Sequence, residues 1–232
     1  MFSLVIPFYN EEACVIDVVT GLVKAARQAK ITLQFILVNN GSRDRTGFLI
    51  RKLTQKYNNI RAITVLKNRG YGHGIRQGLV QAKTPYVGYM CGDGQIDPQD
   101  LVKLIREIRR HPKLDLVKVW RKTRYDGLKR KVISQIYNQL FRSLFQIQIR
   151  DVNGTPKIFK RALFEKLDLT ADDWFIDAEL MLKASTGNYL VKEIPIRFFR
   201  RQSGNSYVKG VTLWEFLRNL LWYRIKTLIY NE

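Results

Sequence analysis

The first half of the chain alternates short apolar runs with longer segments whose apolar residues recur every three to four positions. The short runs predict β-strands and the longer segments predict helices. The expected strands are Phe2–Pro7, Leu33–Val38, Ile60–Leu66, Tyr86–Cys91 and Leu114–Trp120. The expected helices are Glu11–Ala29, Thr46–Tyr57, Gly74–Ala82 and Pro98–Arg110. This alternation is typical of an α/β fold with a mostly parallel sheet flanked by helices.

Two segments of the second half place apolar residues on one helical face with cations beside them. The first runs from Leu128 to Phe145 and begins with three consecutive cations, and the second runs from Val211 to Tyr230 and is rich in Trp and Tyr. Helices of this kind bind membrane surfaces, although many amphipathic helices simply pack on their own sheet. We expect at least one of them to be interfacial. The chain then divides into a main domain at residues 1–210 and a C-terminal amphipathic helix at 211–232.

Composition narrows the class of protein. The chain has 232 residues, of which 46% are hydrophobic, so it is long and apolar enough to fold. Its 40 Lys and Arg against 20 Asp and Glu give a net charge of +20, which predicts an anionic partner: nucleic acid, a phosphorylated metabolite or the anionic leaflet of a membrane.

Targeting signals and cysteine usage narrow the compartment. Cys14 and Cys91 are the only cysteines, which excludes a disulfide scaffold and a thiolate zinc site and favours a reducing compartment. Neither a secretory signal nor an uncharged stretch of about 20 residues is present. We therefore expect a cytoplasmic protein that lies peripherally on a membrane.

The loops after the strands carry the unusual residues, and in an open α/β sheet these loops form the ligand site. Asn39–Thr46 is a polar turn, and Lys67–Gly74 has three glycines whose backbone amides can approach a phosphate at a helix N-terminus. Asp93 and Gln95, alternate residues of the fourth loop, can both face one hard cation. Each loop alone also has an ordinary explanation as a turn or a helix cap.

Taken together and in order, these motifs resemble the family 2 glycosyltransferases of GT-A fold, and most closely the dolichol- or polyprenyl-phosphate mannose or glucose synthases. The segments that carry the resemblance are Val5–Glu12, Val38–Thr46, Asn68–Gly72, Gly92–Pro98, Asp151–Arg161, Phe175–Leu180 and Arg201–Ser206. The resemblance implies an inverting hexosyltransferase that uses a GDP- or UDP-linked sugar as donor and a polyprenyl phosphate as acceptor in the synthesis of a cell-envelope glycan.

The resemblance also implies roles for individual residues. The nucleotide-sugar site would comprise Pro7, Tyr9, Asn10, Glu11, Asn40, Ser42, Asp44, Asn68, Gly70, Gly72 and Asp93. Asp93 and Gln95 would bind Mg²⁺ or Mn²⁺ on the donor diphosphate. Arg121, Arg124, Lys129, Arg201 and Ser206 would bind phosphate or acceptor, and the catalytic set would be Asp93, Asp177, Glu179 and Arg201.

The chain departs from the family pattern in two places. Cys91 replaces the first acid of the metal loop, and Asn39 and Asn40 replace paired acids, one of which recognises the nucleobase elsewhere in the family. The first departure bears on the number of protein ligands to the metal. The second leaves open whether the base of the donor nucleotide is uracil or guanine.

The chemistry of the acceptor separates the remaining alternatives. A lipid phosphate is already a nucleophile at neutral pH, whereas a glycan or glycolipid hydroxyl needs a general base, for which Asp177 and Glu179 are the candidates. An integral-membrane protein or a second copy of this chain is a further expected partner. A nucleic-acid-binding module would also explain the charge, but the chain has no recognition motif of that kind, and we expect no nucleic-acid partner.

Overall fold

The sheet has seven strands, six of which run parallel. The computed structural model describes residues 1–201 and 218–225. The strand order is β3-β2-β1-β4-β6-β5-β7, and β6 alone runs antiparallel, between β4 and β5. The strands are β1 (Phe2–Phe8), β2 (Leu33–Asn40), β3 (Ile60–Val65), β4 (Tyr86–Tyr89), β5 (Leu116–Arg124), β6 (Lys157–Lys160) and β7 (Val191–Phe198). The mostly parallel sheet expected from the sequence is confirmed.

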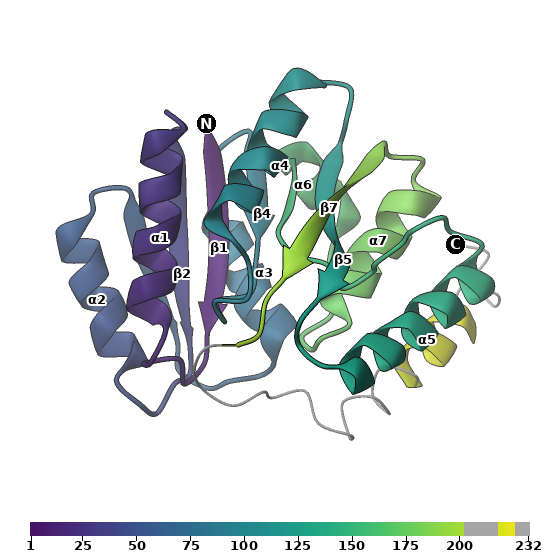
Figure 1. The fold of residues 1–232 in the computed structure, drawn as a ribbon, viewed down its shortest axis with the longest axis horizontal. Helices are drawn as coiled ribbons and strands as arrows, with labels where there is room; N and C mark the ends of the chain where they lie inside the picture. Colours follow the sequence, from purple (N-terminus) through teal and green to yellow (C-terminus); the bar gives the residue numbers. More distant parts are fainter. Residues whose placement is uncertain (202–217, 226–232) are drawn as a thin grey trace.

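Helices cover both faces of this sheet (Figure 1). They are α1 (Val15–Gln28), α2 (Thr46–Lys56), α3 (Tyr71–Gln81), α4 (Pro98–Arg110), α5 (Leu128–Phe145), α6 (Arg161–Leu167) and α7 (Ile176–Thr186), with a further helical segment at residues 218–225. One core cluster joins the sheet to α1, α2 and α4, and a second joins it to α3, α5, α6 and α7. Every residue of β1 is buried because this strand lies between the two layers.

The order in which strands are added to the sheet reverses at β1. Strands β2 and β3 are added on one side of β1, and β4 then pairs with its other side. The loops that follow β1 and β4 therefore diverge and leave a crevice at the carboxyl edge of the sheet, the usual ligand position in such folds.

Helix α5 divides its apolar residues between two sides. Tyr137 and Phe141 pack into the second core cluster, whereas Leu128, Val132, Ile136 and Leu140 are exposed. These four residues, spaced by four, form what we call the α5 stripe. It is an outward-facing apolar row on a helix that Figure 1 places at the rim of the molecule.

Residues 218–225 pack beside α5. Tyr223 contacts the rings of Phe145 and Phe175, and Leu220 is buried, while Leu221 and Trp222 are exposed. The rest of the C-terminal amphipathic helix expected at 211–232 lies outside the described residues, and the division into two domains stays a prediction. No helix in the described part of the chain has both the length and the hydrophobicity to span a bilayer.

Candidate active site

A cavity of about 610 Å³ opens at the carboxyl ends of β1, β2, β4 and β5, and α5 forms one of its walls. Thirteen of the residues expected in the site from the sequence line it: Pro7, Tyr9, Glu11, Asn40, Asn68, Gly70, Asp93, Gln95, Arg121, Arg124, Lys129, Asp177 and Arg201. The fold thus gathers residues that are up to 194 positions apart in the sequence, from Pro7 to Arg201.

Asn10, Ser42 and Asp44 do not line the cavity. They join the loop after β1 to the loop after β2: the Asn10 N–H donates to Ser42 Oγ at 3.1 Å, and the Glu12 N–H donates to Asp44 Oδ2 at 3.1 Å. Burial opposes ionisation of Asp44, but hydrogen bonds from Thr46 and Glu12 lower its pKa below the ordinary value. These residues hold the shape of the loops that carry Tyr9 and Asn40.

The glycine-rich turn has a packing role instead of the expected phosphate cradle. The Gly72 N–H donates to the Asp173 carbonyl at 3.1 Å, and the His73 N–H donates to the Asp172 carbonyl at 2.9 Å. A Cβ at Gly70 would lie 2.2 Å from the Asp172 carbonyl oxygen, and Gly70 has a φ of +130°. These amides are therefore already used by the 172–173 backbone, and Gly72 lies outside the cavity, so we do not assign it to the donor site.

Asn40 lines the cavity, but the oxygen of its side-chain amide is itself buried. Its side-chain nitrogen donates to the Gly70 carbonyl at 2.9 Å, which fixes the amide. Among the described residues, its Oδ1 atom is buried without a hydrogen-bond partner. A buried acceptor without a donor costs free energy, and this atom lies against Gly74 in the first turn of α3.

The metal loop places one carboxylate at the cavity. Burial raises the pKa of Asp93, and the N–H of Gln95 and the charges of Arg121 and Arg130 partly offset this. The Gln95 side-chain nitrogen is committed to the Phe199 carbonyl at 2.7 Å. Burial and the Asp93 charge raise the pKa of Cys91 to about 12, so its thiol, in contact with Tyr71, stays protonated at neutral pH. A cation beside Asp93 would offset the cost of its burial, and in this respect the site fits a divalent ion.

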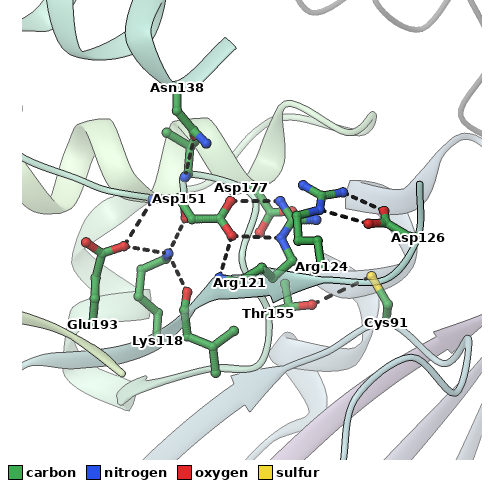
Figure 2. Close-up of polar contacts among 12 residues, drawn as sticks. Cys91, Lys118, Arg121, Arg124, Asp126, Asn138, Asp151, Thr155, Asp177 and Glu193 are labelled. Atoms are coloured by element: carbon green, nitrogen blue, oxygen red, sulfur yellow. Dashed lines mark hydrogen bonds and ion pairs between the residues drawn. The ribbon is translucent and has the colours of Figure 1, made fainter. Parts of the chain in front are cut away.

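The expected phosphate-binding cations are prearranged by carboxylates. Arg121 forms a two-point contact with Asp151, and Arg124 forms a similar one with Asp126, as Figure 2 shows. Burial alone would lower the pKa of Arg121, but the Asp151 charge raises it above its ordinary value. Arg201 pairs with Glu11. Ser206, expected in the same loop as Arg201, lies outside the described residues.

The two acids expected as bases have different surroundings. Asp177 lines the cavity, and its Oδ1 atom accepts hydrogen bonds from the Tyr89 hydroxyl at 2.8 Å and from the buried Lys157. Glu179 lies outside the cavity. Its carboxylate accepts from the N–H groups of Thr170 and Ala171 and pairs with Lys183, so it holds the loop before α7. We assign Glu179 a folding role and no chemical one.

Several lining residues were not expected from the sequence. Tyr71 and Trp174 stack at 4.5 Å between ring centroids, which gives the cavity an aromatic wall. Asp126, Asn153, Thr155 and Tyr137 also line it. Asn153 and Thr155 lie in the 151–161 motif, so that motif was a usable signal. Asp126 and Trp174 belong to none of the motifs.

Comparison with known proteins identifies the family. A model described as glycosyl transferase family 2 matches residues 3–168. The chain belongs to this family. Family 2 relatives include the dodecaprenyl-phosphate galacturonate synthase of Rhizobium johnstonii, 30% identical over 73% of this chain and 51% of that protein. An undecaprenyl-phosphate 4-deoxy-4-formamido-L-arabinose transferase of Photorhabdus laumondii is 27% identical over 94% of this chain and 66% of that protein. The chain thus matches between half and two thirds of the length of these two relatives.

Solved structures show that the fold is shared more widely. Glucosyl-3-phosphoglycerate synthase from Mycobacterium tuberculosis, solved with Mn²⁺, uridine diphosphate and phosphoglyceric acid, superposes with a TM-score of 0.75 at 16% identity. The superposition covers 97% of this chain and 78% of that one. The GT-A fold expected for a family 2 chain is therefore confirmed.

Proposed function

We propose that this protein transfers a hexose from a nucleotide diphosphate sugar to a polyprenyl phosphate at a membrane surface. The names of the two curated relatives support this acceptor class, because both describe sugar transfer to a polyprenyl phosphate. The GDP- or UDP-linked donor comes from the resemblance seen in the sequence.

The observation that carries the proposal is the double role of α5. Lys129, Arg130, Ile133 and Tyr137 on one side of this helix line the cavity, while the α5 stripe points outward. An apolar stripe beside basic residues suits insertion into an anionic lipid surface. A polyprenyl phosphate embedded in that surface would meet the cationic mouth of the cavity with its headgroup while its chain stayed in lipid.

The donor would occupy the opposite wall. Pro7, Tyr9 and Asn68 lie where the nucleoside would bind, and Asn40 lines the same cavity. Asp93, with the Gln95 side-chain oxygen and donor phosphate oxygens, would hold Mg²⁺ or Mn²⁺, because such ions bind through few carboxylates and several substrate oxygens. The ion would neutralise charge on the diphosphate leaving group. Arg121, Arg124 and Arg201 would bind the remaining phosphate charge.

The acids of the cavity favour a phosphate acceptor over a hydroxyl. The Oδ1 atom of Asp177 is occupied by Lys157 and by the Tyr89 hydroxyl, so this oxygen is not free to receive a proton from an acceptor hydroxyl. A phosphate monoester needs no base, since it is ionised at neutral pH.

The test is a transfer assay with two acceptors. Purified protein, MnCl₂ and a panel of radiolabelled UDP- and GDP-sugars are incubated with undecaprenyl phosphate or with a glycolipid that offers only hydroxyl groups. We expect label on the lipid phosphate. Transfer to the hydroxyl acceptor alone would contradict the proposal and support the alternative family 2 activity on a glycan or glycolipid.

We further propose a peripheral position on the cytoplasmic face of the membrane. The net charge of +20 and the basic start of α5 complement the anionic lipids of that leaflet. A contact with an integral-membrane partner, or with a second copy of the chain, stays a prediction.

A further inference from the structure

Arg121 is held in the cavity by contacts on several sides. It extends from β5, and its side chain is only 13% exposed. Its Nε and Nη2 atoms each donate to one oxygen of Asp151 at 2.7 Å, and its guanidinium lies 5.2 Å from the centroid of the Phe198 ring. The backbone N–H of Arg121 donates to the same carboxylate at 3.0 Å. Within the described residues, Nη1 of Arg121 has no hydrogen-bond partner, so this edge is left for a ligand.

Asp151 is held in turn from behind. The fully buried Lys118 donates to the Asp151 carbonyl and, at 3.2 Å, to Glu193 Oε1, which also accepts the Asp151 N–H at 3.2 Å. Figure 2 shows the resulting row of alternating charges, which runs from Glu193 through Lys118 and Asp151 to Arg121. The row joins β7, β5 and the 150–152 segment, and it ends at the cavity.

The row is costly to bury. Buried ion pairs are often no more stabilising than apolar residues of the same size, because desolvation offsets the attraction. A row that served stability alone could be replaced by apolar packing between β5 and β7. What the charges supply in addition is a fixed orientation of a planar donor, since a two-point contact defines both the position and the plane of a guanidinium.

We propose that Asp151, held by Lys118 and Glu193, is a positioning residue that aims the Nη1 edge of Arg121 at a substrate phosphate. This rests on the proposed function only in naming phosphate as the ligand. Asp151 itself does not line the cavity, so it acts through Arg121.

A double-mutant cycle tests this role by binding, without turnover. The variants are Asp151→Asn, Arg121→Ala and their combination, and the probes are UDP, GDP and farnesyl phosphate, each titrated calorimetrically with MgCl₂ present. We expect Arg121→Ala to weaken at least one probe by about tenfold or more, the usual loss for a charge-assisted hydrogen bond. Asp151→Asn should weaken the same probe by several-fold in the wild-type background and leave its affinity unchanged in the Arg121→Ala background. The probe affected identifies the donor or the acceptor phosphate.

Asp115→Asn is the matched control, because Asp115 pairs with Lys160 and accepts the Leu190 N–H at the opposite end of β5. It should lower the melting temperature without changing probe affinity. If Asp151→Asn fails to fold, Glu193→Gln loosens the row from its far end and should show the same dependence on Arg121.

Equal losses in both backgrounds would overturn the positioning role while leaving the proposed function intact. If the wild-type protein bound none of the three probes, the proposed function and the positioning role would fall together.

Discussion

The α5 stripe gives the sharpest test of membrane attachment. Val132 and Ile136 are one turn apart near its centre and are 51% and 56% exposed. Replacing both with serine removes their apolar surface. Serine has a helix propensity close to those of valine and isoleucine, so α5 itself should persist.

The size of the effect follows from the exposed fractions. Full burial of one such side chain contributes roughly 1.5–3 kcal/mol, so burying the exposed half of each contributes about 1 kcal/mol. The double variant then loses about 2 kcal/mol of membrane binding. This corresponds to about a 30-fold smaller partition coefficient, since about 1.4 kcal/mol is a factor of ten.

The assay is co-sedimentation with vesicles of phosphatidylcholine that contain phosphatidylglycerol. Val80→Ser is the matched control, because Val80 is 59% exposed on α3 and does not belong to the α5 stripe. We expect it to bind like the wild-type protein. The double variant should also transfer sugar to undecaprenyl phosphate in vesicles more slowly, while its activity on soluble farnesyl phosphate stays near that of the wild type.

Two results would refute this reasoning. Unchanged sedimentation of the double variant would show that the α5 stripe is not the membrane contact. An equal loss for Val80→Ser would show that vesicle binding reflects general surface hydrophobicity. Circular dichroism of each variant excludes unfolding as the cause.

Four further predictions concern the cavity and its support. Asp93→Asn should abolish divalent-dependent transfer without lowering the melting temperature at pH 7, because the raised pKa means that the ionised carboxylate destabilises the fold above that pKa. For the same reason the apparent affinity of the wild-type protein for Mn²⁺, measured through activity, should decline on acidification at a higher pH than an ordinary aspartate would cause. Cys91→Ser should raise the activation free energy that corresponds to kcat/KM by no more than about 1 kcal/mol, since a hydroxyl can still contact Tyr71 and neither side chain carries charge. A larger loss in kcat/KM with the fold intact would require a chemical role for the thiol. Glu179→Gln should lower the free energy of unfolding, measured with urea, by about 1–3 kcal/mol, because it weakens the acceptor for two backbone N–H groups at Thr170 and Ala171. A variant that is as stable as the wild type but inactive would show that Glu179 has a chemical role.

The sequence predicted the parts of the fold that local patterns determine. The start of each of the first four strands and both ends of α4 agree with expectation, because apolar runs and the Asp97 cap followed by Pro98 are local signals. Strands β6 and β7 were not expected. Strand β6 is four residues long and begins with a lysine that is fully buried against Asp177, and no local pattern reveals such a long-range partner.

The site was predictable to the extent that a motif places its residues at the crevice. Asp93, Asn40 and Arg121 line the cavity as expected, because Asn40 ends β2, Asp93 lies in the loop after β4, and Arg121 lies in the last part of β5. Gly72 shows the limit of this reasoning. The sequence indicates that a glycine is needed there, but the reason is the carbonyl oxygen of Ala171, 2.4 Å from where a Cβ would lie, and this neighbour is known only from the fold.

The arrangement of charge in the cavity bears on how two anionic substrates could meet. The loops after β1 and β4, where the nucleotide would bind, carry the acidic side chains Glu11 and Asp93, and α5, where the acceptor would bind, carries Lys129 and Arg130. Arg121 lines the same cavity, its charge lowers the pKa of Asp93, and α5 follows the strand that carries it. A diphosphate and a lipid phosphate repel each other as they approach, and a fixed guanidinium near them lowers that repulsion without having to move. On this reasoning, the free energy needed to bury the charged row behind Arg121 is offset at the step in which the two phosphates must be closest. We therefore expect loss of the row to affect substrate binding more than folding.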